Sequence, residues 1–173
     1  MTVHWLVEAL ADSGRGDALL KLLTNEDDYG WAGWLEQGGT FTPEAWELSG
    51  SANSASHGWG SRAATDVLAS VLGIDITTPG GSELLVTVPD TGLGHAEGSR
   101  MTQYGRVSST WRRDGAGTTL TTTLPVNTTA VVELPEGQYV ATGSGGVRAE
   151  RLEGADGVVR YRVGSGTWTF TTG

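Results

Sequence analysis

Apolar positions in the first seventy residues recur with the period of an α-helix. Val3, Leu6, Val7 and Leu10 follow the i, i+3, i+4, i+7 spacing that places side chains on one helical face. Similar stripes predict helices over residues 2–12, 17–23, 30–37 and 61–72, with Thr2 as N-cap of the first. The first two would form a helical hairpin. We expect a further short helix to begin at Pro43, because proline suits a first helical turn.

Beyond Gly73 the pattern changes from helical spacing to short alternating segments between glycine-rich turns. Strands are predicted over 83–88, 106–113, 118–124, 129–134, 138–142, 158–163 and 167–171, with a hairpin turn at 114–117. So many short strands favour an antiparallel β-sandwich. The sequence therefore predicts an α+β protein in two parts, a helical segment over 1–76 and a β-sandwich over 77–173.

The formal net charge of −9 argues against nucleic acid and against an anionic membrane surface as partners. The charge is uneven, because residues 1–60 hold nine acidic residues against Arg15 and Lys21. There is no cysteine, and the three histidines lack partners at metal-ligand spacing, so we predict neither a metal site nor a cofactor.

No signal peptide and no membrane-spanning run of about 20 apolar residues is visible. A cytoplasmic protein, or a secreted one that includes this chain as part of something longer, fits equally well. The helical pattern begins at once, which suggests a piece of a longer protein.

Residues 38–60 form the stretch that carries chemistry, because acids, a histidine and tryptophans meet there in loop-like sequence. They are Glu44, Trp46, Glu47, His57 and Trp59. A carboxylate that moves a proton, together with flat indole faces, suits a site that cleaves sugars. The alternative is a surface loop with incidental tryptophans, in which Glu44 is only a helix-start acid and His57 is structural.

Trp31 and Trp34 are spaced i, i+3 on the third predicted helix and suit either a core or a sugar platform.

The order of several motifs resembles the C-terminal part of bacterial α-L-rhamnosidases of glycoside hydrolase family 78. In chain order they read "GTFTPEAWE", "SHGWGS", "LASVLGI", "TPGGSELLVTVPDTGLGHAEG", "YGRVSSTWRR" and "VGSGTWTF". The resemblance covers nearly the whole chain. It implies the last part of a catalytic (α/α)6 barrel followed by a C-terminal β-sandwich.

The resemblance also implies inverting hydrolysis of terminal α-L-rhamnose, with one glutamate as general acid and another as general base. Glu44 matches the base and His57 the site histidine, whereas Pro43 replaces a tryptophan of the family's motif. Sugar contacts would then come from Trp46, Trp59, Glu47, Trp31 and Trp34. The substrate would be a rhamnosyl glycoside or oligosaccharide.

The general acid of the family lies upstream of the matched region, so we expect this chain alone to hydrolyse nothing. The uncovered helical stripes predict an upstream barrel segment or self-association as partner. The alternative function is a non-catalytic carbohydrate-binding or scaffold module.

Overall fold

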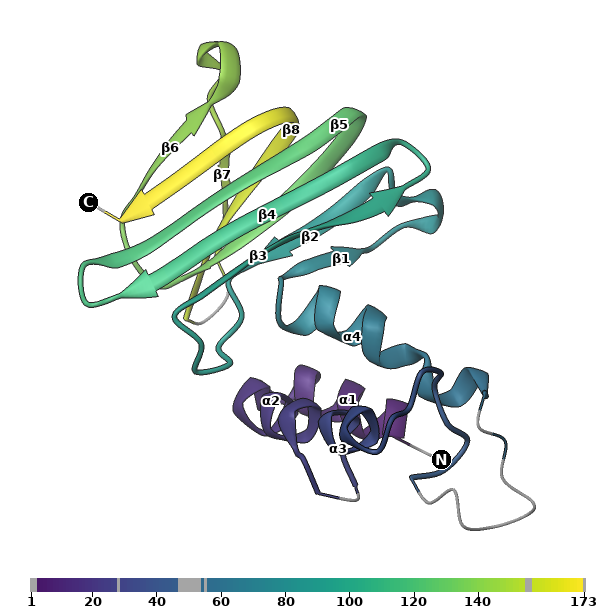
Figure 1. The fold of residues 1–173 in the computed structure, drawn as a ribbon. Helices are drawn as coiled ribbons and strands as arrows, with labels where there is room; N and C mark the ends of the chain where they lie inside the picture. Colours follow the sequence, from purple (N-terminus) through teal and green to yellow (C-terminus); the bar gives the residue numbers. More distant parts are fainter. Residues whose placement is uncertain (1–2, 28, 47–53, 55, 155–156, 173) are drawn as a thin grey trace. The chain divides into compact units, whose positions relative to one another are not determined.

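A computed structural model of the chain describes residues 3–27, 29–46, 54, 56–154 and 157–172 (Figure 1). The chain divides into two compact units. The helical unit comprises Met1–Val71 with Asp90–Gly92, and the sheet unit comprises Leu72–Pro89 with Leu93–Gly173.

The helical unit contains the four helices that apolar spacing predicts. They are α1 (Val3–Asp12), α2 (Gly16–Thr24), α3 (Trp31–Glu36) and α4 (Arg62–Ser70), with a 3-10 turn η1 (Gly58–Gly60) before α4. The expected N-cap Thr2 lies outside the described residues. In the part of the chain that the structure describes, no helix has the length and apolar character needed to cross a membrane.

The predicted hairpin of α1 and α2 is confirmed. Gly14 has a φ of +68°, which few other residues tolerate, and this lets the chain reverse after α1. The amide of Arg15 donates a hydrogen bond to the carbonyl of Leu10 at 2.8 Å. Val7 on α1 and Leu19 on α2 are buried, so each helix contributes an apolar residue to the unit's core.

The helix expected to begin at Pro43 does not form in its described part, residues 43–46, which are irregular. The amide of Glu44 donates to the carbonyl of Ser54 at 2.9 Å, ten residues further along the chain. Proline favours a first helical turn but does not enforce one, and here pairing across a loop takes its place.

The sheet unit has eight strands among its described residues. They are β1 (Ile74–Ile76), β2 (Glu83–Thr87), β3 (His95–Thr102), β4 (Gly105–Asp114), β5 (Gly117–Pro135), β6 (Tyr139–Gly143), β7 (Glu150–Leu152) and β8 (Val158–Thr172). The hydrogen-bonded order runs β1-β2-β5-β4-β3, and β8 pairs with β5, β6 and β7. The predicted hairpin at 114–117 is confirmed, with Asp114 opposite Gly117.

The two long strands β5 and β8 each take part in both layers of the fold (Figure 1). The first half of β5 pairs with β4, and its second half pairs with β2 after a register shift between Leu124 and Thr129. Tyr161 and Phe170, from opposite halves of β8, meet with ring centroids 5.2 Å apart. The sheet therefore folds over itself, so that its inner face becomes a shared core. The largest fully buried side chains of that core are Trp111, Phe170, Ile74, Leu84, Leu120 and Leu134.

Several features of the sheet unit differ from the sequence prediction, including the strands β1 and β7, which were not predicted. The predicted strands 118–124 and 129–134 are one strand, β5, as are 158–163 and 167–171 in β8. The β2–β5 pairing is parallel, whereas an all-antiparallel arrangement was expected. Strand β3 replaces an expected loop. Its residues pair with residues 105–112 of β4 although none of them is buried, so apolar alternation gave no sign of it in the sequence.

Candidate active site

The segment that leads to Glu44 is anchored on helix α3 by Trp34. This indole is 5% exposed, and its Nε1 donates a hydrogen bond to the carbonyl of Phe41 at 2.7 Å. Gly39 lies directly against the ring, so that a Cβ added there would stand 2.0 Å from Nε1. Only glycine permits this approach, and the chain after α3 is thereby held against the helix.

Two pairs of hydrogen bonds close the base of the loop between Glu44 and His57. The amide of His57 donates to the carbonyl of Thr42 at 2.7 Å, and the Thr42 hydroxyl donates to the carbonyl of His57 at 2.9 Å. The Glu44 amide donates to Ser54, and the Ser54 amide donates to Oε2 of Glu44, both at 2.9 Å. Thr42 and Glu44 therefore lie beside His57 and Ser54, and this brings the backbones of Glu44 and His57 onto neighbouring stretches.

Glu44 is half-buried, and one oxygen of its carboxylate is oriented by a backbone amide. The group thus lies neither in an apolar core nor free in solvent. A charge-assisted hydrogen bond of this kind restricts the side chain to one direction. A carboxylate fixed in this way can accept a proton from a water molecule or a sugar hydroxyl placed beside it.

Gly60 fixes the entry to helix α4 against the same segment. A Cβ at Gly60 would lie 2.9 Å from the carbonyl oxygen of Pro43 and 2.9 Å from Cβ of Thr42. Pro43 itself is buried. The residue that departs from the family's motif therefore serves as a packing surface for the chain beyond His57.

Trp31 and Trp46 form an aromatic corner, and Trp46 follows Glu44 closely in the sequence. Their rings meet edge to face, with centroids 5.1 Å apart and planes at 84°. Both are half-buried, and Nε1 of Trp31 is buried without a hydrogen-bond partner among the described residues. Such a corner can serve as one wall of a pocket for a ring with apolar C–H faces.

The remaining predicted site residues differ in how far they can be placed. Trp34 is the buried anchor described above. Glu47 lies outside the described residues, and only the backbone of Trp59, in η1, lies within them. No group of three or more histidine, aspartate or glutamate side chains suited to a metal ion occurs in the described part of the chain.

Sequence reasoning missed the residues that position Glu44. Thr42 and Ser54 anchor the loop through backbone and hydroxyl hydrogen bonds. Serine and threonine make such local bonds in most loops, so their presence alone does not single out a site. The sequence also gave no sign that Gly39 and Gly60 are close-packing positions, because the approach of residues far apart in the chain leaves no local pattern.

Comparison with known families matches the helical part and the sheet part of the chain to two different domains. Residues 1–66 match the bacterial α-L-rhamnosidase six-hairpin glycosidase domain. Residues 73–148 match the bacterial α-L-rhamnosidase C-terminal domain. The chain thus corresponds to the C-terminal part of bacterial α-L-rhamnosidases, namely the end of the six-hairpin glycosidase domain and the C-terminal domain. The family resemblance and the α+β fold class predicted from the sequence are both confirmed.

Individual relatives agree with this assignment over nearly the whole chain. An α-L-rhamnosidase of Streptomyces avermitilis is 30% identical over 182 aligned positions, which cover 96% of this chain. The crystal structure of the Streptomyces avermitilis enzyme complexed with L-rhamnose superposes with a TM-score of 0.79 at 25% identity, covering 97% of this chain. The α-L-rhamnosidase from Dictyoglumus thermophilum gives a TM-score of 0.77 over 96% of this chain at 23% identity, which supports the fold alone.

The matched region is a small part of each relative. The chain spans 17% of the Streptomyces avermitilis protein and 20% of the Dictyoglumus thermophilum chain. The comparisons thus relate the chain to glycosidases through the end of their six-hairpin domain and the domain that follows.

Proposed function

We propose that this chain supplies the general-base side of an α-L-rhamnosidase active site, with Glu44 as the base. The observation that carries the proposal is the half-buried Glu44 carboxylate, oriented by the Ser54 amide on a loop closed at its base next to His57. This loop lies within residues 1–66, the region matched to the six-hairpin glycosidase domain.

The proposed reaction is inverting hydrolysis of a terminal α-L-rhamnoside. Glu44 takes a proton from a water molecule, and that water attacks the anomeric carbon from the face opposite the leaving group. A second carboxyl group, roughly 6.5–9.5 Å away, donates a proton to the departing oxygen. His57 is proposed to hydrogen-bond the water or a sugar hydroxyl, on the segment paired with that of Glu44.

The apolar faces of a deoxy sugar require flat apolar walls. The Trp31–Trp46 corner fits this requirement, because its edge-to-face geometry presents two surfaces at right angles. Trp34 contributes to the proposed pocket mainly by holding Phe41 in place, and Trp59 and Glu47 are proposed as further sugar contacts. That the Streptomyces avermitilis enzyme was crystallised with L-rhamnose supports this choice of sugar.

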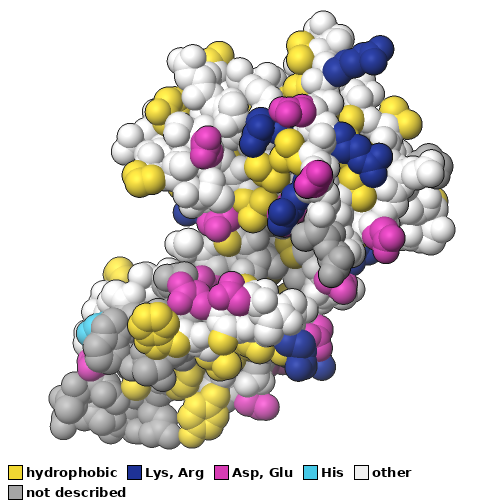
Figure 2. All heavy atoms as spheres, turned by 180° about the vertical axis from the view of Figure 1, so that it is seen from behind, with side chains coloured by type: hydrophobic (Ala, Val, Ile, Leu, Met, Phe, Trp, Pro, Cys, Tyr) yellow, Lys and Arg dark blue, Asp and Glu magenta, His cyan; other side chains and the backbone are white. Residues whose placement is uncertain are grey.

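The proton donor of the reaction is proposed to come from upstream residues of a complete barrel. The chain spans only 17% of the Streptomyces avermitilis relative, which leaves ample sequence for a second carboxylate. The helical unit also carries exposed large apolar side chains (Figure 2), namely Trp5, Leu6, Tyr29, Leu35 and Phe41. Other barrel helices would cover such a surface, so we expect the chain by itself to lack activity.

The proposal is tested by a graft. The chain replaces the matched 17% of the Streptomyces avermitilis enzyme, and hydrolysis of a nitrophenyl α-L-rhamnoside is measured. We expect Glu44→Gln to lower kcat by about 10²- to 10⁴-fold, as loss of a general base does. The amide retains an oxygen that accepts the Ser54 hydrogen bond, so the loop should stay in place.

Glu36→Gln is the matched control, since Glu36 is an exposed acid at the end of α3 and should leave kcat unchanged. Azide added to Glu44→Ala should restore turnover by attacking without the need for a base. Equal kcat for Glu44→Gln and Glu36→Gln would remove Glu44 from the mechanism.

A further inference from the structure

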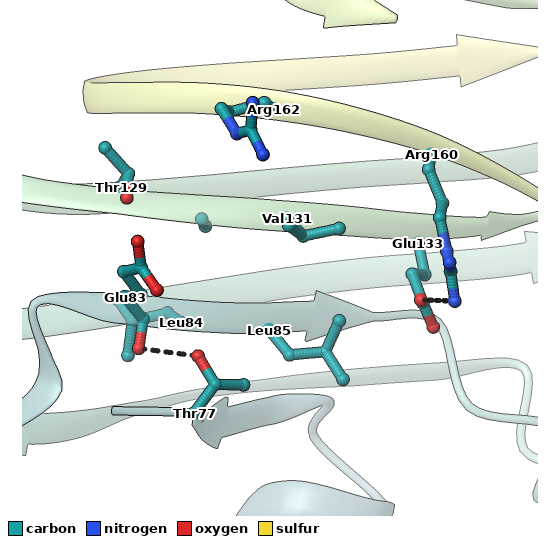
Figure 3. A pocket seen from close by; sticks show the side chains of 10 residues that line it. Thr77, Glu83, Leu84, Leu85, Thr129, Val131, Glu133, Arg160 and Arg162 are labelled. Atoms are coloured by element: carbon teal, nitrogen blue, oxygen red, sulfur yellow. Dashed lines mark hydrogen bonds and ion pairs between the residues drawn. The ribbon is translucent and has the colours of Figure 1, made fainter. Parts of the chain in front are cut away.

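The outer face of strands β2, β5 and β8 carries a groove far from Glu44 in the sequence. Its volume is about 320 Å³, within the range of small-molecule sites. All of its lining residues belong to the sheet unit. Figure 3 shows side chains from the three strands pointing into it.

Strand register fixes where each lining group lies. Glu83 of β2 is opposite Thr129 of β5 at one end of the groove. Leu85 is opposite Val131 in the middle, and Val131 is opposite Arg162 of β8. Alternate residues on one strand are about 7 Å apart, so successive rows of lining groups are separated by that distance.

The far end of the groove holds an ion pair between an acidic and a basic side chain. Glu133 of β5 is opposite Arg160 of β8, and their side chains form an ion pair. Nε of Arg160 is buried and has no hydrogen-bond partner among the described residues. A buried donor left without a partner costs free energy.

The charges of the lining residues balance. Glu83 and Glu133 supply carboxylate acceptors, Arg160 and Arg162 supply guanidinium donors, and their formal charges cancel. The interspersed acidic and basic side chains of the sheet unit are visible in Figure 2. Arg162 also forms an ion pair at 3.6 Å with Glu150 of β7, which lies outside the lining, so the groove with its rim gives no attraction to an anion while its donors and acceptors stay in place for hydrogen bonds.

The middle of the groove is apolar. Leu85 and Val131 are both half-buried and form a floor between the two polar ends (Figure 3). An apolar floor between fixed donors and acceptors suits a molecule with one C–H face and a ring of hydroxyl groups.

We propose that this groove is a binding site for a neutral saccharide. The sugar's C–H face lies on Leu85 and Val131, and its hydroxyls donate to Glu83 and accept from Arg162. Thr129 supplies a hydroxyl at the same end. The site stands apart from the proposed catalytic function, so either can fail without the other.

The groove is tested by ¹H–¹⁵N NMR on the full chain, titrated with L-rhamnose, D-galactose, D-glucuronate or inorganic phosphate. We expect one or both neutral sugars to shift the backbone amides of residues 83–85, 129–133 and 160–162 with a millimolar dissociation constant. Arg162→Gln and Glu83→Gln should each weaken binding about tenfold or more, because each removes a hydrogen bond to a charged group.

Arg112→Gln is the matched control, an exposed strand arginine on β4 outside the groove, and it should bind as the unaltered chain does. The amide spectrum of each variant also reports whether the sheet unit is folded. The proposal would be overturned if the neutral sugars shifted only amides near 42–57. It would also be overturned if they shifted no amide at concentrations up to about 50 mM, which is on the order of the weakest useful affinities. Binding of phosphate or glucuronate without the neutral sugars would overturn it as well, in favour of an anion site.

Discussion

Replacing Gly39 by alanine should release the chain segment that positions Glu44. The added methyl group would lie 2.0 Å from Nε1, 2.3 Å from Cε2 and 2.5 Å from Cδ1 of Trp34. All three atoms belong to a rigid ring, so no flexible end can move aside. Either the indole shifts and its 2.7 Å hydrogen bond to the Phe41 carbonyl breaks, or the backbone at residue 39 moves away from the ring.

The expected cost follows from three effects. Breaking the hydrogen bond leaves a buried donor unpaired, at about 1–3 kcal/mol. Overpacking against the ring costs about 1–3 kcal/mol more. Alanine also restricts the unfolded chain, which returns about 0.4–1 kcal/mol. The first two effects dominate, so the free energy of unfolding of the helical unit should fall by about 1–5 kcal/mol.

Urea unfolding followed by circular dichroism at 222 nm measures this change, because most of that signal comes from α1 to α4. The indole N–H resonance of Trp34 should move at the same time, since it loses its acceptor. Gly58→Ala is the matched control, as no atom lies within 4 Å of the added methyl. Equal urea midpoints for the two variants, with an unmoved Trp34 resonance, would refute this account of how the segment is anchored.

Two further predictions concern the sheet unit. Phe170 is fully buried, so Phe170→Ala should lower its free energy of unfolding by about 3–5 kcal/mol, whereas the exposed Phe41→Ala should leave the sheet's melting temperature unchanged. Burial raises the pKa of Tyr139 above 10.0 by more than the Thr118 hydroxyl lowers it. The unfolded chain then loses its phenol proton first, so stability should fall as pH rises from 10 toward the folded pKa, and Tyr139→Phe should flatten this decline in urea midpoints. An equally steep decline in the unaltered chain and in Tyr139→Phe would contradict this role of Tyr139.

The helices and most strands could be predicted because their signals are local. Val7 and Leu19 lie on apolar stripes that the sequence shows directly, and both are buried. The alternation of Val159, Tyr161 and Val163 with arginines likewise indicated a strand with one buried face, as observed. Apolar periodicity reports burial on one side of an element, so it succeeds wherever a segment has one such side.

The sequence suggested the residue types of a candidate site but not its geometry, and the roles of those residues stay a prediction. Glu44, His57 and Trp46 were singled out because acids, imidazole and indoles in loop-like sequence suit sugar chemistry. The helix expected at Pro43 was wrong, because the hydrogen bonds between Glu44 and Ser54 connect residues ten positions apart. No local propensity encodes such a partner.

The sequence alone determined the order of helical and strand segments, the division into an acidic aromatic part and a β part, and the family. Tertiary structure decided that β5 and β8 each serve both layers, that β2 joins β5 in parallel, and that β3 is a strand at all. It also brought Glu83, Val131 and Arg162 together on one face. These outcomes depend on pairing between segments far apart in the chain, and a sequence read in order carries no signal for that until the strands meet.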